Sequence, residues 1–540
     1  MTKLIKLLVV LYTAVGGLKA TFLTDFLHTA VALILIIYFT LSVLTNEHIG
    51  GLGGLYDKVM STASENYIPD NYEGSLLTMK SKGAIIWGLV LKFGNLALVV
   101  MDTAFWQKSF ASEVNSTVPA YNLAAIAVFG IPWGLGTVLG LSARALHLTP
   151  IFPTYPADIT ETEVSTGLVM PFLVKALIGD SGIVAFFVLL FMALTSTVSS
   201  SMIAVSSILS FDIYKTYFNP KATDRKLLKA SHVTVVIHAV FITGISIALN
   251  YGGANMTWLG YFRPVLSCPG IIPLGLTLFW SGQTKLAAIL APVLGFFTGL
   301  AIWLGTAYAL YGEVNMITTG NPLPALYGAI GSFFSPAIYS VVISLYKPYK
   351  FDWRIFLRIE LAEEAQLHSS DKSTATVIES EVREKSGTNT PKRDTSDTAA
   401  ATTATADPEH AAALEKPNAA SRAYSTPVSE LSLDDIRHPF DEKTLRELYR
   451  WMKIAWVIFV VIVLVTFILW PMPLYRNYIF SKSFFSGWVS VAIVWQFFAF
   501  SAVVIYPLYD GRYEIDKGAR GMWKSTKEFV AKRRSKTLDS

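Results

Sequence analysis

The sequence has little cysteine and little charge, and both scarcities restrict what the protein can be. Its single cysteine, Cys268, rules out an intrachain disulfide and argues against a metal site built from cysteines. Charged residues make up only 15% of the 540 residues, whereas 52% are hydrophobic, which is more apolar sequence than a water-soluble domain of this size needs. Several apolar runs exceed the roughly 20 residues that cross a bilayer as a helix. The sequence therefore predicts an all-α polytopic membrane protein.

Signs of enzymatic chemistry and of nucleic-acid binding are also lacking. No nucleophile–base pair, metal-ligand cluster or phosphate-binding loop stands out, so we expect neither an enzyme nor a resident cofactor. The net charge of +5 is modest, and the basic residues lie beside the apolar runs. That distribution is typical of a protein oriented in a membrane rather than of one that binds nucleic acid. The expected partners are membrane lipid and a small-molecule substrate, and the oligomeric state is left open.

Eleven apolar segments are candidate membrane spans, and the Lys and Arg residues between them predict their orientation. The loops after the fifth, ninth and eleventh segments are basic, and strict alternation of the spans places all three loops in the cytoplasm. The C-terminus is therefore predicted to be cytoplasmic, in a protein of the plasma membrane. The segments are 7–18, 23–44, 83–106, 120–142, 183–213, 230–250, 258–281, 285–310, 323–345, 452–471 and 484–508.

Local sequence signals predict a broken span and a capped helix. The seventh segment contains three prolines, and broken helices at membrane depth are tolerated where they line a cavity, which favours a transporter over a simple anchor. In the long loop 143–182, Thr160 and Glu163 predict a capping box for a helix that ends near Gly179. The three prolines are Pro264, Pro269 and Pro273.

Composition divides the chain into four parts. Residues 1–350 are predicted to form a transporter core, and residues 451–510 to form two C-terminal membrane helices. Between them, residues 351–450 are predicted to form a largely disordered cytoplasmic linker, because residues 365–435 are rich in Ser, Thr, Ala, Glu and Lys and poor in aromatic residues. Residues 511–540 are predicted to be a basic cytoplasmic tail.

One apolar stretch, residues 191–215, carries nine hydroxyl side chains between Thr195 and Ser210. Within it, Ala193, Ser196 and Thr197 stand at i, i+3 and i+4, so they share one face of the predicted helix. Hydroxyl and carbonyl oxygens of this kind can bind a small hard cation. The alternative is that small hydroxyl residues allow close helix packing and bond back to carbonyls of their own helix. From the stretch alone, packing is the favoured interpretation.

Five further stretches together resemble the sodium:solute symporter family. YTAVGGLKATFLTD resembles the family segment that joins two core helices, and SSILSFDIYKTY resembles the cytoplasmic end of its cation-site helix. The other three resemble the urea active transporter branch of the family. The resemblance covers nearly the whole chain except the linker, and the stretches occur in the family's order. They occupy residues 12–25, 93–111, 150–172, 206–217 and 484–512.

The resemblance implies an inverted-repeat (LeuT-like) transporter fold, with substrate and cation held between two five-helix repeats. Spans three to seven would form the second repeat, whereas the opening helices of the first have no counterpart here. The fold is therefore expected to be N-terminally incomplete and transport to be compromised. The implied function is a secondary active symporter for urea or related small amides or polyamines, driven by a proton or sodium gradient. A non-transporting sensor or regulatory membrane protein on the same scaffold is the alternative.

The resemblance also assigns roles to individual residues. Ala193, Ser196 and Thr197 match the family's cation-binding positions, which raises the functional interpretation above packing. Asp25 matches an aspartate at the cytoplasmic face, where an ion-path role and an ordinary interfacial charge are about equally expected. Asn95 and Asp102, seven residues apart in the third span, would lie two turns apart on one face and could bind urea. For Asp102, a pairing with Lys108 is the alternative.

Overall fold

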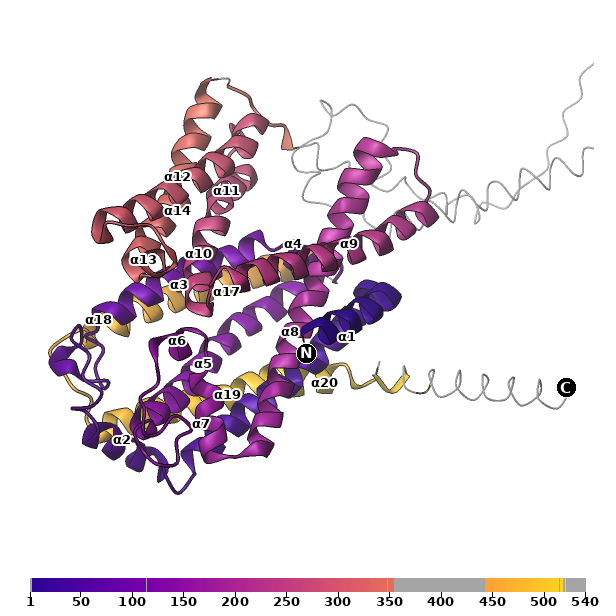
Figure 1. The fold of residues 1–540 in the computed structure, drawn as a ribbon. Coiled ribbons are helices and arrows are strands. Elements are labelled where there is room, and N and C mark those ends of the chain that lie inside the picture. Colours follow the sequence, from indigo (N-terminus) through magenta and orange to yellow (C-terminus); the bar gives the residue numbers. More distant parts are fainter. Residues whose placement is uncertain are drawn as a thin grey trace, which may run out of the picture.

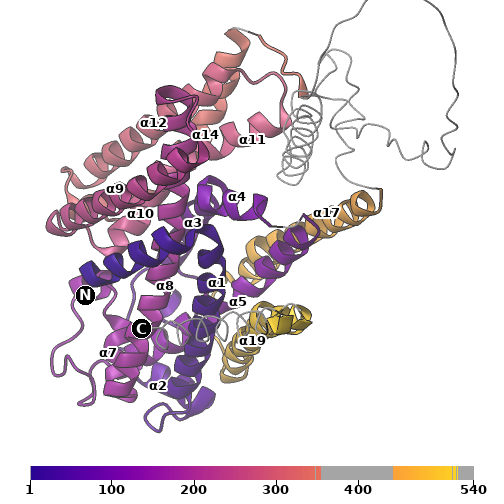
Figure 2. The same ribbon diagram turned by 90° about the vertical axis from the view of Figure 1, so that its right-hand side faces the viewer.

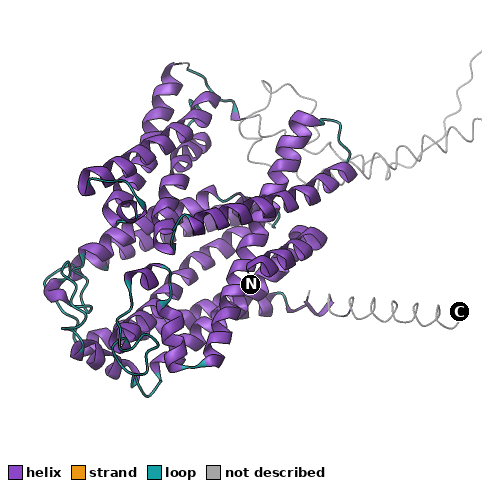
Figure 3. Cartoon of the chain, in the orientation of Figure 1, coloured by secondary structure: helices purple, strands orange, loops and turns teal. Residues whose placement is uncertain are grey.

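Helices form nearly all of the protein that the computed structural model describes, namely residues 2–112, 114–346, 348–353, 442–513, 515–517 and 520. The side chains of residues 2–16, 18–20 and 114 are outside this description. Figure 3 shows the helical character, and these residues form no strand beyond one isolated bridge between Asn71 and Ser81. The helices are α1 (Thr2–Leu44), α2 (Gly51–Ser61), α3 (Lys82–Met101), α4 (Thr103–Phe110), α5 (Val114–Leu146), α6 (Glu161–Ser165), α7 (Val169–Leu177), α8 (Asp180–Ser207), α9 (Asp224–Tyr251), α10 (Met256–Ser267), α11 (Ile271–Phe279), α12 (Lys285–Tyr311), α13 (Met316–Thr319), α14 (Pro322–Tyr346), α17 (Glu442–Val463), α18 (Pro471–Leu474), α19 (Lys482–Phe500) and α20 (Tyr506–Asp510).

Ten helical stretches of the described part are long and apolar enough to cross a membrane. They confirm the all-α polytopic class and correspond to the second to eleventh predicted spans. The first predicted span, 7–18, falls in the part of α1 whose side chains are not described. The predicted linker, 351–450, lies mostly outside the described residues, as does the predicted tail. The ten stretches are Thr21–Leu44, Lys82–Met101, Asn115–Leu146, Asp180–Phe218, Asp224–Tyr251, Met256–Phe279, Lys285–Tyr311, Pro322–Tyr346, Glu442–Leu474 and Lys482–Asp510.

The helices pack in two groups, which Figures 1 and 2 show at opposite ends of the molecule. In one group α1 lies along α8, and α5 packs against both α1 and α19. Its hydrophobic core includes Phe39, Val43, Leu173, Phe485 and Val489, none of them more than 1% exposed. In the other group α12 lies along α14, and α10 packs against α3 and α14. The first group brings α1 and α8 together, and these two helices position the candidate site.

Small residues bring α12 close to α14. They recur every four residues on α12, so they form one stripe along the helix, as is common where membrane helices pack closely. A Cβ atom built on Gly299 would lie 1.7 Å from the Ser332 hydroxyl oxygen, whereas one built on Gly305 would meet no atom within 4 Å. Gly299 is therefore required by packing and Gly305 is not. The buried small residues are Ala287, Ala291, Gly295, Gly299 and Ala307.

The structure shows both predicted local features. The seventh predicted span is broken into α10, a short 3-10 segment at Cys268–Gly270, and α11. The capping box is also present: Thr160 donates to the Glu163 carboxylate through its backbone N–H at 2.9 Å and its hydroxyl at 2.8 Å. These bonds, the backbone bond foremost, lower the pKa of Glu163. The capped helix α6 ends early, because Gly167 has a positive φ of 85° and separates α6 from α7.

Candidate functional site

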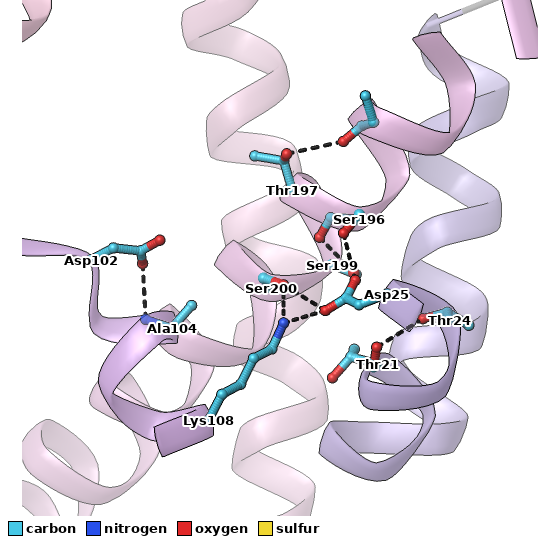
Figure 4. Close-up of polar contacts among 11 residues, drawn as sticks. Thr21, Thr24, Asp25, Asp102, Ala104, Lys108, Ser196, Thr197, Ser199 and Ser200 are labelled. Atoms are coloured by element: carbon cyan, nitrogen blue, oxygen red, sulfur yellow. Dashed lines mark hydrogen bonds and ion pairs between the residues drawn. The ribbon is translucent and has the colours of Figure 1, made fainter. Parts of the chain in front are cut away.

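Asp25 and the hydroxyl-rich face of α8 form the centre of the candidate site (Figure 4). Asp25 lies near the first residue of the Thr21–Leu44 span, where α1 packs along α8. Ser196 donates its hydroxyl hydrogen to Asp25 Oδ1 at 2.6 Å, and Ser200, one turn further, lies 3.5 Å from Oδ2. Residues four apart share a helix face, so both serines point toward α1. The structure thus brings together two residues that the sequence analysis treated separately, Asp25 and Ser196.

Lys108 completes this cluster from a third helix. It lies on α4, which packs against α8. Its ammonium group forms an ion pair with Asp25 Oδ2 and donates to the Ser200 hydroxyl oxygen at 2.7 Å. The Lys108 and Asp25 side chains are only 22% and 20% exposed, so water screens the pair weakly. The alternative role suggested for Asp102, pairing with Lys108, is wrong in this structure, because Lys108 pairs with Asp25 instead.

Ala193 and Thr197 lie apart from the cluster. The Thr197 hydroxyl donates to the Ala193 carbonyl oxygen at 2.9 Å, which is the bond to the same helix that a packing residue would make. Figure 4 shows this bond pointing away from the Asp25 carboxylate, and Thr197 is exposed. Of the three predicted cation ligands, Ser196 therefore faces Asp25, whereas the oxygens of Ala193 and Thr197 lie next to each other outside the cluster. Their assignment as cation ligands remains a prediction.

Asn95 and Asp102 do not lie on one helix face, which corrects the prediction. Helix α3 ends at Met101, and Asp102 has an extended backbone with ψ 109°. Its Oδ1 accepts a hydrogen bond from the Ala104 N–H at 2.9 Å, so Asp102 is the N-cap of α4. The break follows from the ability of an aspartate side chain to satisfy the first free N–H groups of a helix. Both side chains are exposed.

Asn95 has a partner that the sequence analysis did not consider. Arg263 of α10 donates from Nη2 to Asn95 Oδ1 at 2.9 Å, and its Nε is buried without a hydrogen-bond partner. Arg263 lines a pocket of about 440 Å³ that also borders Trp87, Ser165 and Thr257. No carboxylate pairs with Arg263 among the described residues. An arginine inside a predicted span was the available signal, because ionisable residues in membrane helices are commonly functional.

Comparison with known proteins places the chain among membrane transporters. The sodium:solute symporter family matches residues 3–295. The chain is 35% identical over 521 residues to a urea active transporter of Saccharomyces cerevisiae (strain ATCC 204508 / S288c), covering 95% of this chain and 70% of that protein. It is 34% identical over 510 residues to a probable urea active transporter of Schizosaccharomyces pombe (strain 972 / ATCC 24843), covering 94% and 66%. A urea-proton symporter of Oryza sativa subsp. japonica is 34% identical over 366 residues, covering 65% and 50%.

These relatives are transporters rather than enzymes, and the match extends through most of the chain. The chain spans about two thirds of the length of the two fungal relatives and half the length of the plant one. The family match covers more than half of the 540 residues. Together with the ten apolar helices, it shows an integral membrane protein. The chain belongs to the sodium:solute symporter family.

Proposed function

We propose that this protein is a symporter that couples uptake of urea, or of a related small amide or polyamine, to a proton or sodium gradient. The coupling is supported by one observation above all: Asp25, at the end of one membrane span, is bonded to Ser196 of another and paired with Lys108. Ionisable groups at membrane depth are rare and commonly lie on ion or proton paths. The substrate class is supported by the names of the relatives, which are urea active transporters and a urea-proton symporter.

In this proposal the hydroxyl face of α8 serves the driving ion. Ser196, with the adjacent oxygens of Ala193 and Thr197, would bind a cation, because a small hard cation prefers oxygen ligands. Asp25 would lie on the path of the ion to the cytoplasm. Because Ser196 donates its hydroxyl hydrogen to the Asp25 carboxylate, a cation that binds next to Asp25 would change this hydrogen bond.

The proposed substrate contacts come from α3 and from α10, which packs against it. Urea offers four N–H donors and a carbonyl acceptor, so it needs both donor and acceptor groups in its site. The Arg263 guanidinium would donate to the urea carbonyl from the wall of the 440 Å³ pocket. Asn95, which Arg263 contacts through Oδ1, would accept from a urea N–H group. Asp102 caps α4 and is not among the residues that line this pocket, so it is not proposed as a second contact of the same urea.

Uptake of labelled urea by the full chain, in cells that lack their own urea transport, tests this function. We expect weak uptake, above that of cells carrying an empty vector but below that of cells carrying the S. cerevisiae relative, and loss of that excess when the ion gradients are collapsed. Excess unlabelled acetamide or spermidine, added separately, would compete if the site accepts amides or polyamines. Uptake that persists without any gradient would show a passive route, and no urea-specific uptake at all would contradict the substrate assignment.

The orientation is also a proposal, with the C-terminus in the cytoplasm of a plasma-membrane protein. The basic loops between spans support it. Asn115, Ser116 and Thr117 form a glycosylation sequon, and this orientation places it on the cytoplasmic side, at the start of the Asn115–Leu146 span. We expect no glycan at Asn115 in protein that has passed through a secretory membrane. A glycan found there by mass spectrometry would reverse the orientation.

A further inference from the structure

The position of Lys108 indicates which cation lies next to Asp25, Ser196 and Ser200. Lys108 owes its position to the break in the helix at Asp102. Helix α4, which Asp102 caps, packs against α8 and carries Lys108 in its last turn. Its ammonium group reaches two oxygens, one from Asp25 and one from Ser200. These two oxygens belong to different helices, so the ammonium joins α1 and α8 at this point.

The cluster contains one negative charge and one positive charge. Asp25 is the carboxylate, Ser196 and Ser200 are neutral, and Lys108 balances the charge. A carboxylate that is four-fifths shielded from water is strongly destabilised unless a cation is next to it. A free metal cation that used Asp25 and Ser200 as ligands would have to displace the ammonium or lie against it, where like charges repel. The ammonium therefore occupies the position that a free cation would need.

We propose that Lys108 is the resident cation of the Asp25, Ser196 and Ser200 cluster and excludes free sodium from it. This inference rests on the proposed function, because it assigns Lys108 as the residue that determines which ion can act at this site. It predicts that the cluster of the parent protein has no measurable sodium affinity, and that removal of the ammonium creates a sodium site. The new site would have the carboxylate and two hydroxyls as oxygen ligands.

Thermal stability of the purified full chain tests the inference without any transport measurement. Melting temperatures are compared in sodium chloride and in N-methyl-D-glucamine chloride of equal concentration. For the parent and for Lys108→Arg, which keeps a positive charge, we expect no sodium-specific shift that is lost when Asp25 is changed to Asn. We expect Lys108→Ala to melt at a lower temperature in N-methyl-D-glucamine and to be stabilised as sodium rises, since a ligand that binds only the folded state raises its stability.

The double variant Lys108→Ala with Asp25→Asn is the control, because it lacks both charges and should show no sodium-specific shift beyond that of the parent. If Lys108→Ala is not recovered folded, Lys108→Gln replaces it, since it retains a donor for Ser200 but carries no charge. A sodium shift in the parent that disappears in Asp25→Asn would overturn the inference, as would the absence of a shift in the uncharged Lys108 variants. Neither result bears on gradient-driven uptake of urea, which the uptake assay measures. The failure of this inference and the failure of the proposed function can therefore be distinguished.

Discussion

Removal of the Ser196 hydroxyl tests whether this serine serves the ion or the packing of α8. Ser196→Ala deletes the 2.6 Å bond to Asp25 Oδ1 and leaves the ion pair with Lys108 in place. Hydrogen bonds between membrane helices average about 0.6 kcal/mol, whereas bonds to charged groups contribute about 1.5–3 kcal/mol. Because Asp25 is 20% exposed, water can replace part of the lost bond.

We therefore expect a loss of about 1 kcal/mol, which corresponds to roughly a fivefold rise in the half-saturating concentration of the driving ion. The assay is labelled urea uptake against proton and sodium concentration, with abundance in the membrane measured in the same cells. If Ser196 binds or orients the ion site, abundance stays near that of the parent while the ion dependence shifts.

Ser246→Ala is the matched control for this change. Ser246 lies on α9, is exposed, and donates to the Ile242 carbonyl of its own helix at 2.8 Å. Its removal costs a bond of the kind that packing hydroxyls make and should leave the ion dependence unchanged. If Ser196→Ala lowers abundance but leaves the half-saturating ion concentration at the parent value, Ser196 is a packing residue, and the cation-site interpretation is refuted.

Two further changes test packing and capping. Gly299→Ala should destabilise the protein by about 1–3 kcal/mol through overpacking against Ser332, whereas Gly305→Ala should melt in detergent at the parent temperature or above it. If the two variants melt at the same temperature, the packing of α12 on α14 described here is wrong. Because the pKa of Glu163 is lowered in the folded protein, its capping contribution is present above its unfolded pKa and is lost as pH falls through the folded value. Hydrogen exchange at Glu163 N–H, which bonds to Thr160 Oγ1, should accelerate beyond the intrinsic pH effect on acidification, and unchanged protection would contradict this.

The spans and the caps could be predicted from the sequence because they depend on residues close together in the chain. Apolar length predicts eleven spans, and the second to eleventh correspond to the ten apolar helices of the described residues. The three prolines of the seventh span predict its interruption. Thr160 and Glu163 are three residues apart, so their reciprocal bonds follow from spacing. The family resemblance, carried by short motifs, is confirmed by the match over residues 3–295.

The site was less predictable because its contacts join distant parts of the chain. Lys108 and Asp25 are separated by 83 residues, and periodicity gives no information about such a pair. The position of Asp102 was predicted wrongly because an aspartate in an apolar run can either bind a ligand or cap a helix, and the sequence is the same in both cases. Only its bond to the Ala104 N–H distinguishes the two. Arg263 could have been noticed from its charge within a span, but its partner Asn95 is 168 residues away.

Uptake by the purified chain in sealed lipid vesicles shows whether an ion gradient drives urea through this protein. Labelled urea is supplied outside at a fixed concentration, and a proton or a sodium gradient directed inward is imposed in separate samples. We predict that urea inside the vesicles rises above the outside concentration with at least one of these gradients, and that Asp25→Asn abolishes this accumulation. Urea that only equilibrates across the membrane, at the same rate with and without either gradient, would show that no gradient drives it.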